Sequence, residues 1–226
     1  MDVAEGRAIT FKSGDLNLEG ALHLPEPMPA ERVPGIVVCH PHPQYGGDMR
    51  NNVVEALCEA AVENGLAALR FNFRGVGRSE GGFGAGTDER DDALAALGHL
   101  RSLLEIDQDS IALAGYSFGA GVAMRAASPE LRALIAVSSP TIAAGGLRSN
   151  PLPCPILLIA GDRDEFSDPE ALKRFAEESG AELVILPGVD HFWWGSDDRL
   201  KENVSSFLER RTRQPLTYTD HCHTQI

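Results

Sequence analysis

The stretch Gly115-Tyr-Ser-Phe-Gly119 decides the fold of this chain. An apolar run, Ser110–Ala114, precedes it, and a run of small residues typical of a helix, Ala120–Ala127, follows it. A serine between two glycines on a turn from strand to helix is the signature of a nucleophile elbow. The flanking glycines leave the room that close packing of the strand and the helix requires. The sequence therefore predicts that Ser117 lies on a sharp turn, with its hydroxyl exposed above the edge of a sheet.

Strand and helix patterns alternate along the rest of the chain after an opening hairpin. Strands that are continuously apolar are typical of a mostly parallel sheet covered by helices on both faces, so we expect an α/β fold. The strands are expected at Ile9–Lys12, Leu16–Leu24, Gly35–Cys39, Leu66–Phe73, Ser110–Ala114, Ala133–Val137, Ile156–Ala160 and Glu182–Leu186. The helices are expected at Asn51–Glu63, Asp88–Leu104, Ala120–Ala127, Asp168–Ser179 and Asp197–Arg211.

Length and composition favour one globular domain. The chain has 226 residues, of which 43% are hydrophobic and 23% charged, and its net charge is −13. These values favour a single domain at residues 1–211, followed by a polar tail at 212–226 that is expected to be flexible. The acidic balance argues against a nucleic-acid partner, because such proteins usually present a basic face.

Membrane and disulfide signals are both weak in this sequence. It holds no apolar run of about 18 residues, and its first residues do not resemble a secretory leader, so we expect no membrane partner. Its four cysteines show no paired spacing, and three of them lie in apolar surroundings. This usage favours small buried core residues in a reduced, cytoplasmic protein.

A serine, an aspartate and a histidine, the residue types of a catalytic triad, follow successive predicted strands at their carboxyl ends. Ser117 comes first, then the aspartates Asp162 and Asp164, and then His191. Because the carboxyl ends of parallel strands meet at one edge of a sheet, these side chains are expected to come together. A serine hydroxyl needs an adjacent base to become a nucleophile, histidine suits that task, and an acid orients the imidazole. The order Ser, Asp, His along the chain is the one expected for this fold.

Several further strings resemble one family. His40-Pro-His-Pro43 with Gly46-Gly47, Leu69-Arg-Phe-Asn-Phe-Arg-Gly-Val-Gly77 and Tyr116-Ser-Phe-Gly119 resemble a small dienelactone-hydrolase-like group of the α/β-hydrolase superfamily. The resemblance runs from Gly35 to about Arg211 and implies an α/β-hydrolase fold with about seven or eight strands. It also implies a serine hydrolase that cleaves a carboxylic ester or related acyl bond of a small molecule through an acyl-enzyme.

The resemblance assigns roles to individual residues. In similar proteins the acid follows the glycine by three residues, which favours Asp164 over Asp162 beside Ser117 and His191 as the catalytic set. An oxyanion hole needs main-chain N–H groups aimed at the developing charge. One is expected from Phe118, directly after the nucleophile. The other is expected from His42, in a loop that resembles the His-Gly-X-Pro loop of the superfamily.

Aromatic residues beside His191 are candidates for the substrate wall. Of Trp193 and Trp194, one is expected in the core and the other in the pocket, and Phe192 is expected in the core. The segment Ser138–Pro155 is too short for a substantial cap, so we expect an open site with a minimal lid or none.

Metal and nucleotide sites are disfavoured. His40 and His42 could join His221-Cys-His223 around a metal, but no Cys-x-x-Cys spacing supports zinc, so we expect no metal. The loop Gly75–Gly86 lacks the spacing of a phosphate-binding fingerprint, so we expect no cofactor and a flexible loop near the mouth of the site.

The sequence is also compatible with other functions. The same three side chains could serve an acyltransferase or a serine peptidase, and the fold could host a non-catalytic ligand-binding protein. Arg74 and Arg78 could meet an acidic substrate, but pairing with nearby carboxylates is favoured.

Overall fold

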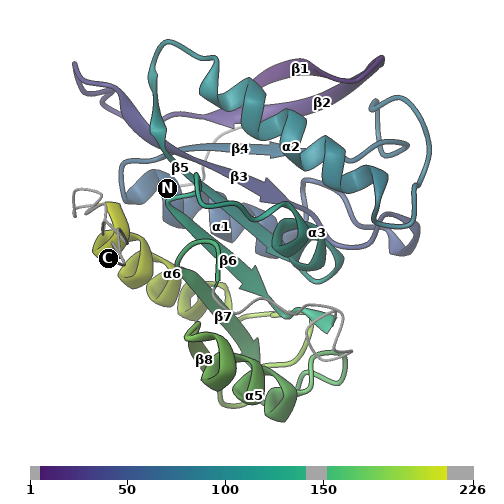
Figure 1. Ribbon diagram of the computed structural model, residues 1–226, viewed down its shortest axis with the longest axis vertical. Helices are drawn as coiled ribbons and strands as arrows, with labels where there is room; N and C mark the ends of the chain where they lie inside the picture. The colour runs from purple at the N-terminus through teal and green to yellow at the C-terminus, as the bar shows by residue number, and fades with distance from the viewer. Residues whose placement is uncertain (1–5, 141–151, 213–226) are drawn as a thin grey trace, which may run out of the picture.

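A computed structural model of the chain describes residues 6–140 and 152–212. Its centre is an eight-stranded sheet with the order β1-β2-β4-β3-β5-β6-β7-β8 (Figure 1). The pairings of β2 with β1 and with β4 are antiparallel, and all the others are parallel. The strands are β1 Arg7–Ser13, β2 Leu16–His23, β3 Val33–Cys39, β4 Ala67–Phe71, β5 Ile106–Tyr116, β6 Ala133–Val137, β7 Ile156–Gly161 and β8 Glu182–Leu186. The predicted, mostly parallel sheet is confirmed.

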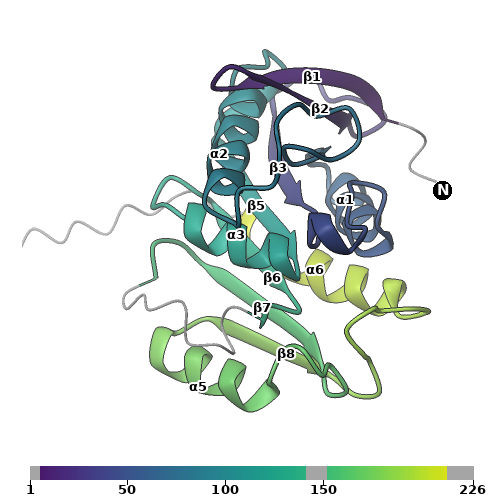
Figure 2. The ribbon, with the colours of Figure 1, turned by 90° about the vertical axis from the view of Figure 1, so that its right-hand side faces the viewer.

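Helices cover both faces of this sheet, as predicted (Figure 2). On one face α1 packs beside α6, and their buried side chains form one apolar cluster with the sheet. On the other face α2, α3 and α5 contribute to a second cluster. The helices are α1 Asn52–Glu63, α2 Asp88–Arg101, α3 Phe118–Ala126, α5 Pro169–Ser179 and α6 Asp197–Thr212.

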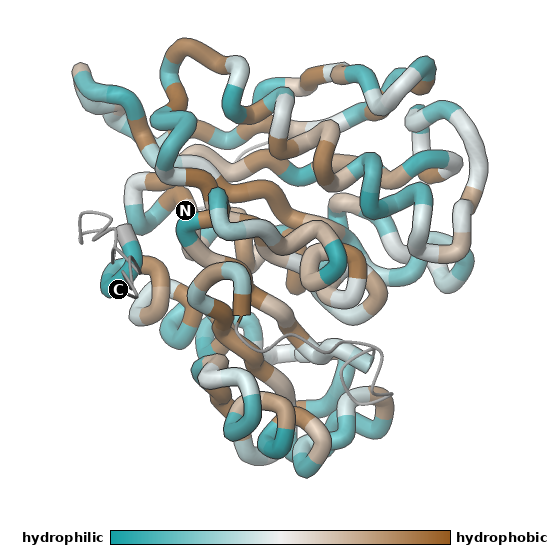
Figure 3. The backbone as a smooth tube through the Cα atoms, in the orientation of Figure 1, coloured by the Kyte–Doolittle hydropathy of each residue, from teal (hydrophilic) through white to brown (hydrophobic). Residues whose placement is uncertain are grey.

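The central strand β3 shows why the strand sequences are continuously apolar. Val37 and Cys39 point to the cluster of α2 and α3, while Ile36 and Val38 point to the cluster of α1 and α6. Successive side chains of a strand face opposite sides, so a strand covered twice needs an apolar residue at every position. Figure 3 shows hydrophobic residues along the central strands and hydrophilic residues on the outer turns.

Some element ends differ from the prediction for local reasons. Strand β4 ends at Phe71 rather than Phe73: the Phe73 N–H donates a hydrogen bond of 3.1 Å to the side chain of His40 instead of to a neighbouring strand. At the other end of the fold, α6 extends through Thr212. The predicted boundary after residue 211 therefore falls within the last turn of this helix, and 213–226 lie outside the described residues.

The described cysteines behave as small core residues. Cys39, Cys58 and Cys154 are free and buried, and Cys222 lies outside the described residues. Burial raises the pKa of the Cys154 thiol to about 11 and that of Cys58 to about 12, so both remain protonated at neutral pH. Within residues 6–140 and 152–212, no helix is long and apolar enough to cross a membrane.

Candidate active site

Ser117 lies on the sharp turn between β5 and α3. Its backbone angles, φ 55° and ψ −117°, are unusual for a residue with a side chain and indicate stored strain. The turn is tight on both sides. A Cβ at Gly115 would lie 2.2 Å from the Gly119 carbonyl oxygen, and one at Gly119 would lie 2.4 Å from the Cys39 carbonyl oxygen. Only glycine fits either position, so the turn holds Ser117 at the carboxyl edge of the sheet.

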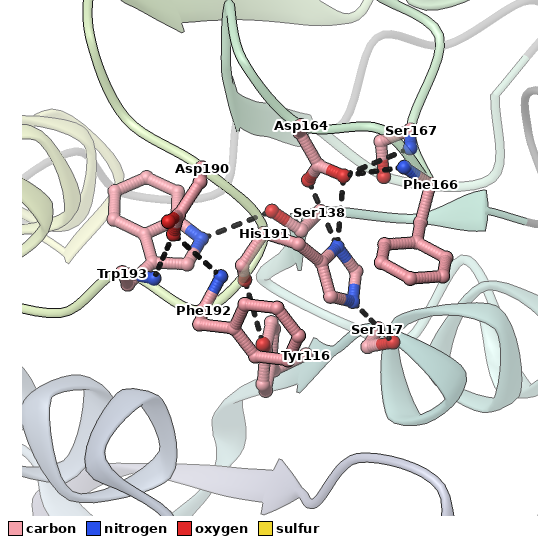
Figure 4. Close-up of polar contacts among 10 residues, drawn as sticks. All are labelled: Tyr116, Ser117, Ser138, Asp164, Phe166, Ser167, Asp190, His191, Phe192 and Trp193. Carbon is pink, nitrogen blue, oxygen red and sulfur yellow. Dashed lines mark hydrogen bonds and ion pairs between the residues drawn. The ribbon is translucent and has the colours of Figure 1, made fainter.

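His191 reaches Ser117 from the loop after β8. Its Nε2 lies 3.0 Å from the Ser117 Oγ (Figure 4). The hydroxyl of Tyr116, the residue before the serine, donates a hydrogen bond of 2.7 Å to the His191 carbonyl oxygen. The two consecutive residues Tyr116 and Ser117 therefore contact the backbone and the ring of His191, respectively.

The carboxylate of Asp164 holds the other side of the His191 ring. Its Oδ1 and Oδ2 lie 2.9 and 3.0 Å from His191 Nδ1, and its Oδ1 also accepts bonds of 2.9 Å from the N–H groups of Phe166 and Ser167. Burial raises the pKa of this carboxyl, but hydrogen bonds from His191, Ser138 and Phe166 outweigh burial and hold it below the usual value. Asp164 therefore stays ionised beside the imidazole.

Asp162, the other candidate acid, serves the loops instead. Its exposed carboxylate accepts a hydrogen bond of 2.6 Å from the Gly188 N–H. The N–H groups of Asp162 and Arg163 donate bonds of 3.0 Å to the carbonyl oxygens of Leu186 and Val189. These bonds join the loop after β7, which carries Asp164, to the loop after β8, which carries His191.

Trp193 and Ser138 pack beside Asp164 and His191 in the interior, and neither lines the cavity. The Trp193 Nε1–H donates a hydrogen bond of 2.9 Å to the Ser138 Oγ, and both residues are fully buried. An indole N–H can only donate, so it occupies a lone pair of the serine oxygen and leaves the hydroxyl proton for Asp164. The sequence analysis missed Ser138, although its position at the carboxyl end of β6 was a usable signal.

The aromatic residues after His191 are arranged differently from the prediction. Trp193 lies in the core and not in the substrate wall, Trp194 is 75% exposed and does not line the cavity, and Phe192, expected in the core, is 52% exposed and does. The reason is a tight turn. The Asp190 carboxylate accepts the N–H groups of Phe192 and Trp193, and Trp193 has φ 64°, so the side chains leave the turn in directions that hydrophobicity alone does not predict.

A cavity of about 730 Å³ opens above Ser117 and His191. Its walls are mostly aromatic or apolar, and none of the described residues that line it is Asp, Glu, Lys or Arg. Residues 141–151, the middle of the segment expected to be too short for a cap, lie outside the described residues. The lining consists of Pro41, His42, Tyr45, Gly46, Gly47, Asn51, Tyr116, Ser117, Phe118, Pro140, Phe166, His191 and Phe192.

Phe118 and His42, the expected oxyanion donors, both line this cavity. Phe118 is the first residue of α3, so its N–H has no acceptor within the helix. The loop of His42 is held by its carbonyl oxygen, which accepts the N–H groups of Tyr45 and Gly47 at 3.1 Å. The rings of His42 and Phe118 lie 4.8 Å apart, so the two loops meet beside Ser117.

His40 is a structural residue. Its Nε2 accepts the Phe73 N–H at 3.1 Å, so the ring proton sits on Nδ1, which donates to the Pro41 carbonyl oxygen at 2.6 Å. Burial lowers the pKa of His40 to about 4, so the ring stays neutral. Among the described residues, no three His, Cys, Asp or Glu side chains form a metal-ligand group, and His221 to His223 lie outside them.

Arg74, just before the loop Gly75–Gly86, and Arg78, within it, are both paired with carboxylates, as expected. Arg74 contacts Asp92 at 2.7 Å and Asp88 at 3.1 Å, and Arg78 contacts Glu19 at 2.8 Å. The pairs tie this segment to β2 and α2, and each arginine has a carboxylate partner.

Comparisons with known proteins agree with this architecture. Residues 36–210 match the family described as alpha/beta hydrolase domain. The chain is 34% identical over 187 residues to the uncharacterized protein RP471 of Rickettsia prowazekii, a match that covers 77% of this chain and 78% of that one.

Two solved structures are similar over nearly the whole described fold. An α/β serine hydrolase homologue of Coxiella burnetii has 34% identity and a TM-score of 0.82, covering 89% of this chain and 97% of its own. XC6422 of Xanthomonas campestris, an α/β serine hydrolase without a lid, has 36% identity and a TM-score of 0.81, covering 94% and 98%. The sheet, the serine turn and the extent of these matches lead to one conclusion: the chain belongs to the alpha/beta hydrolase family and is an enzyme of the hydrolase class.

Proposed function

We propose that this hydrolase cleaves a carboxylic ester of a small molecule through a Ser117–His191–Asp164 triad. The observation that carries the proposal is one continuous line of contacts. Ser117 Oγ lies 3.0 Å from His191 Nε2, and His191 Nδ1 lies 2.9 Å from Asp164 Oδ1. Nucleophile, base and orienting acid are thus each within hydrogen-bond reach of the next.

In the acylation half-reaction, Ser117 Oγ attacks the ester carbonyl carbon while His191 Nε2 takes the hydroxyl proton. The tetrahedral intermediate collapses by breaking the bond to the alcohol oxygen, and His191 returns the proton to that oxygen. The acyl group remains on Ser117. The ionised carboxylate of Asp164 stabilises the imidazolium during this exchange.

Deacylation repeats the sequence with water. His191 takes a proton from the water as its oxygen attacks the acyl carbon, and the proton passes to Ser117 Oγ when the acid leaves. Charge that develops on the carbonyl oxygen is stabilised by the main-chain N–H groups of Phe118 and His42. The N-terminus of α3 adds a favourable helix dipole.

The cavity lining supports a neutral substrate. With no Asp, Glu, Lys or Arg among the described lining residues, a charged group would find no carboxylate, ammonium or guanidinium partner in that lining. Apolar and aromatic surface instead favours uncharged acyl or alcohol groups.

Substitution Ser117→Ala tests the proposal. It is expected to lower kcat/KM on p-nitrophenyl butyrate by about 10³-fold or more, and to abolish labelling by a fluorophosphonate probe. The matched control is Ser206→Ala on the exposed side of α6, which is expected to leave both unchanged. Retention of most of the activity by folded Ser117→Ala would overturn the triad. Products formed in the presence of added alcohols or amines distinguish hydrolysis from acyl transfer.

A further inference from the structure

Two phenylalanine rings flank the imidazole of His191 at the cavity. The Phe166 ring centroid lies 4.7 Å from that of His191, and the Phe192 centroid lies 5.7 Å from it (Figure 4). The two phenylalanine rings stand 6.4 Å apart at an angle of 80°. They are 56% and 52% exposed, so each presents a face or edge to whatever enters the cavity.

The backbone under both rings is fixed by carboxylates. Asp164 accepts the Phe166 N–H at 2.9 Å, and Asp190 accepts the Phe192 N–H at 2.9 Å. The Asn52 side chain donates to the Phe192 carbonyl oxygen at 3.2 Å from the start of α1. Because the supports are main-chain bonds, they fix the backbone positions from which both rings project. Because both rings are exposed at the cavity, they add little to the core and are available for contact with a ligand.

The chemistry of the proposed triad says which part of a substrate meets these rings. His191 Nε2 must deliver its proton to the oxygen of the departing alcohol, so that alcohol lies next to the imidazole during acylation. The acyl oxygen instead faces the N–H groups of Phe118 and His42. Phe166 and Phe192, which flank the imidazole, therefore contact the alcohol part of the ester.

We propose that Phe166 and Phe192 form a leaving-group subsite for an aromatic ring, so that the preferred substrates are neutral esters of aryl or arylmethyl alcohols. This inference rests on the proposed function. An aromatic ring that lies beside both phenylalanine rings, which stand at 80° to each other, can make a stacked contact with one and an edge contact with the other. Such geometry stabilises a bound planar ring more than a bound alkyl group of equal size.

A pair of esters isolates this effect. Benzyl butyrate and cyclohexylmethyl butyrate share their acyl group, and their alcohols are both primary and similar in size. The wild-type enzyme is expected to favour the benzyl ester in kcat/KM by about 3- to 10-fold, the range of an aromatic pair contact. Both esters give the same butyryl-enzyme, so the preference must arise in acylation.

Variants at Phe166 connect the preference to the subsite. Phe166→Leu keeps the apolar character but removes the ring, and is expected to bring the ratio of the two kcat/KM values close to one. Phe166→Tyr restores a ring and is expected to restore the ratio. Trp194→Leu removes an exposed ring that does not line the cavity, and is expected to leave the ratio unchanged.

The outcomes separate this inference from the proposed function. Equal kcat/KM values for the two esters in the wild type, or a preference that survives in both Phe166→Leu and Phe192→Leu, would overturn the subsite and leave the triad standing. If Phe166→Leu and Phe192→Leu lowered kcat/KM only for esters with an aromatic acyl group, the subsite would also be overturned, because the rings would then contact the acyl part. Failure to hydrolyse either ester, together with no labelling of Ser117, would overturn the proposed function itself.

Discussion

The indole Nε1–H of Trp193 donates a hydrogen bond of 2.9 Å to the hydroxyl of Ser138. This bond ties the loop that carries His191 to the carboxyl end of β6. Both residues have a positive φ, 64° for Trp193 and 48° for Ser138, which is uncommon for residues with side chains. Such conformations persist only where the surroundings hold them, so the bond and the two backbones support one another.

Substitution Trp193→Phe is expected to destabilise the protein and to slow catalysis. It leaves Ser138 without its donor and creates a void in the core, which together cost about 2–4 kcal/mol of unfolding free energy. A small displacement of His191 is expected to lower kcat/KM by about 10- to 100-fold. Urea titration and ester hydrolysis measure the two effects.

Trp194→Phe is the control for that change. Trp194 is largely exposed, so this variant is expected to stay within about 0.5 kcal/mol of the wild type. Equal destabilisation by both substitutions would contradict the structural account of Trp193.

Asp164→Asn and Asp162→Asn are expected to separate the two candidate acids. At Asp164 an amide cannot stabilise the imidazolium and favours the wrong tautomer of His191, so kcat is expected to fall by about 10³- to 10⁴-fold. At Asp162 an amide oxygen can still accept the Gly188 N–H, so kcat is expected to change less than about threefold. Comparable losses at both positions would contradict the assignment of the acid.

A methyl group is expected to act oppositely at two glycines. At Gly119 it would meet the Cys39 and His40 carbonyl oxygens at 2.4 and 2.5 Å, so Gly119→Ala is expected to cost about 3 kcal/mol or more. Gly98 lies within α2, where the added atom has nothing within 4 Å. Gly98→Ala is expected to stabilise by about 0.5–1 kcal/mol, because alanine suits a helix better. Thermal unfolding of both variants provides the comparison.

Acidification is expected to destabilise the fold before its carboxylates are protonated. Burial lowers the pKa of His23 and of His40 to about 4, while both have ordinary values when unfolded. As the pH falls from about 6.5 to about 4, His23 and His40 become protonated in the unfolded chain but remain neutral in the folded chain. Stability is therefore complete above the ordinary pKa and declines by up to about 1.4 kcal/mol per pH unit for each histidine.

His23→Gln checks this slope away from the active site. His23 accepts a hydrogen bond of 3.1 Å from Arg70 Nε, a role that the oxygen of a glutamine can also fill. The variant is expected to lose about half of the slope between pH 6.5 and 4 in urea titrations. An unchanged slope would show that His23 binds protons equally well in the folded state.

The sequence predicted the parts of this protein that depend on local pattern. The apolar strands, the turn at Ser117 and the positions of Asp164 and His191 after their strands all follow from periodicity and from the geometry of parallel sheets. The choice between Asp162 and Asp164 needed a resemblance, because both follow the same strand and only their tertiary partners differ.

The surroundings of His191 could not be predicted in the same way. The sequence predicts Phe192 in the core, but the turn held by Asp190 directs it outward and directs Trp193 inward. The position of Ser138 after β6 indicates only that it lies at the edge of the sheet that carries the site, because its role as an acceptor depends on a donor 55 residues away. Tertiary hydrogen bonds of this kind leave no periodic signal.

The contrast between Trp193 and Trp194 provides a built-in optical probe. They are the two tryptophans of the chain, and one is sealed and hydrogen-bonded while its neighbour is open to solvent. Acrylamide would quench the fluorescence of Trp194 first, and a blue-shifted emission from Trp193 would persist only while its loop is docked. Fluorescence can thus follow assembly of the His191 loop without any attached dye.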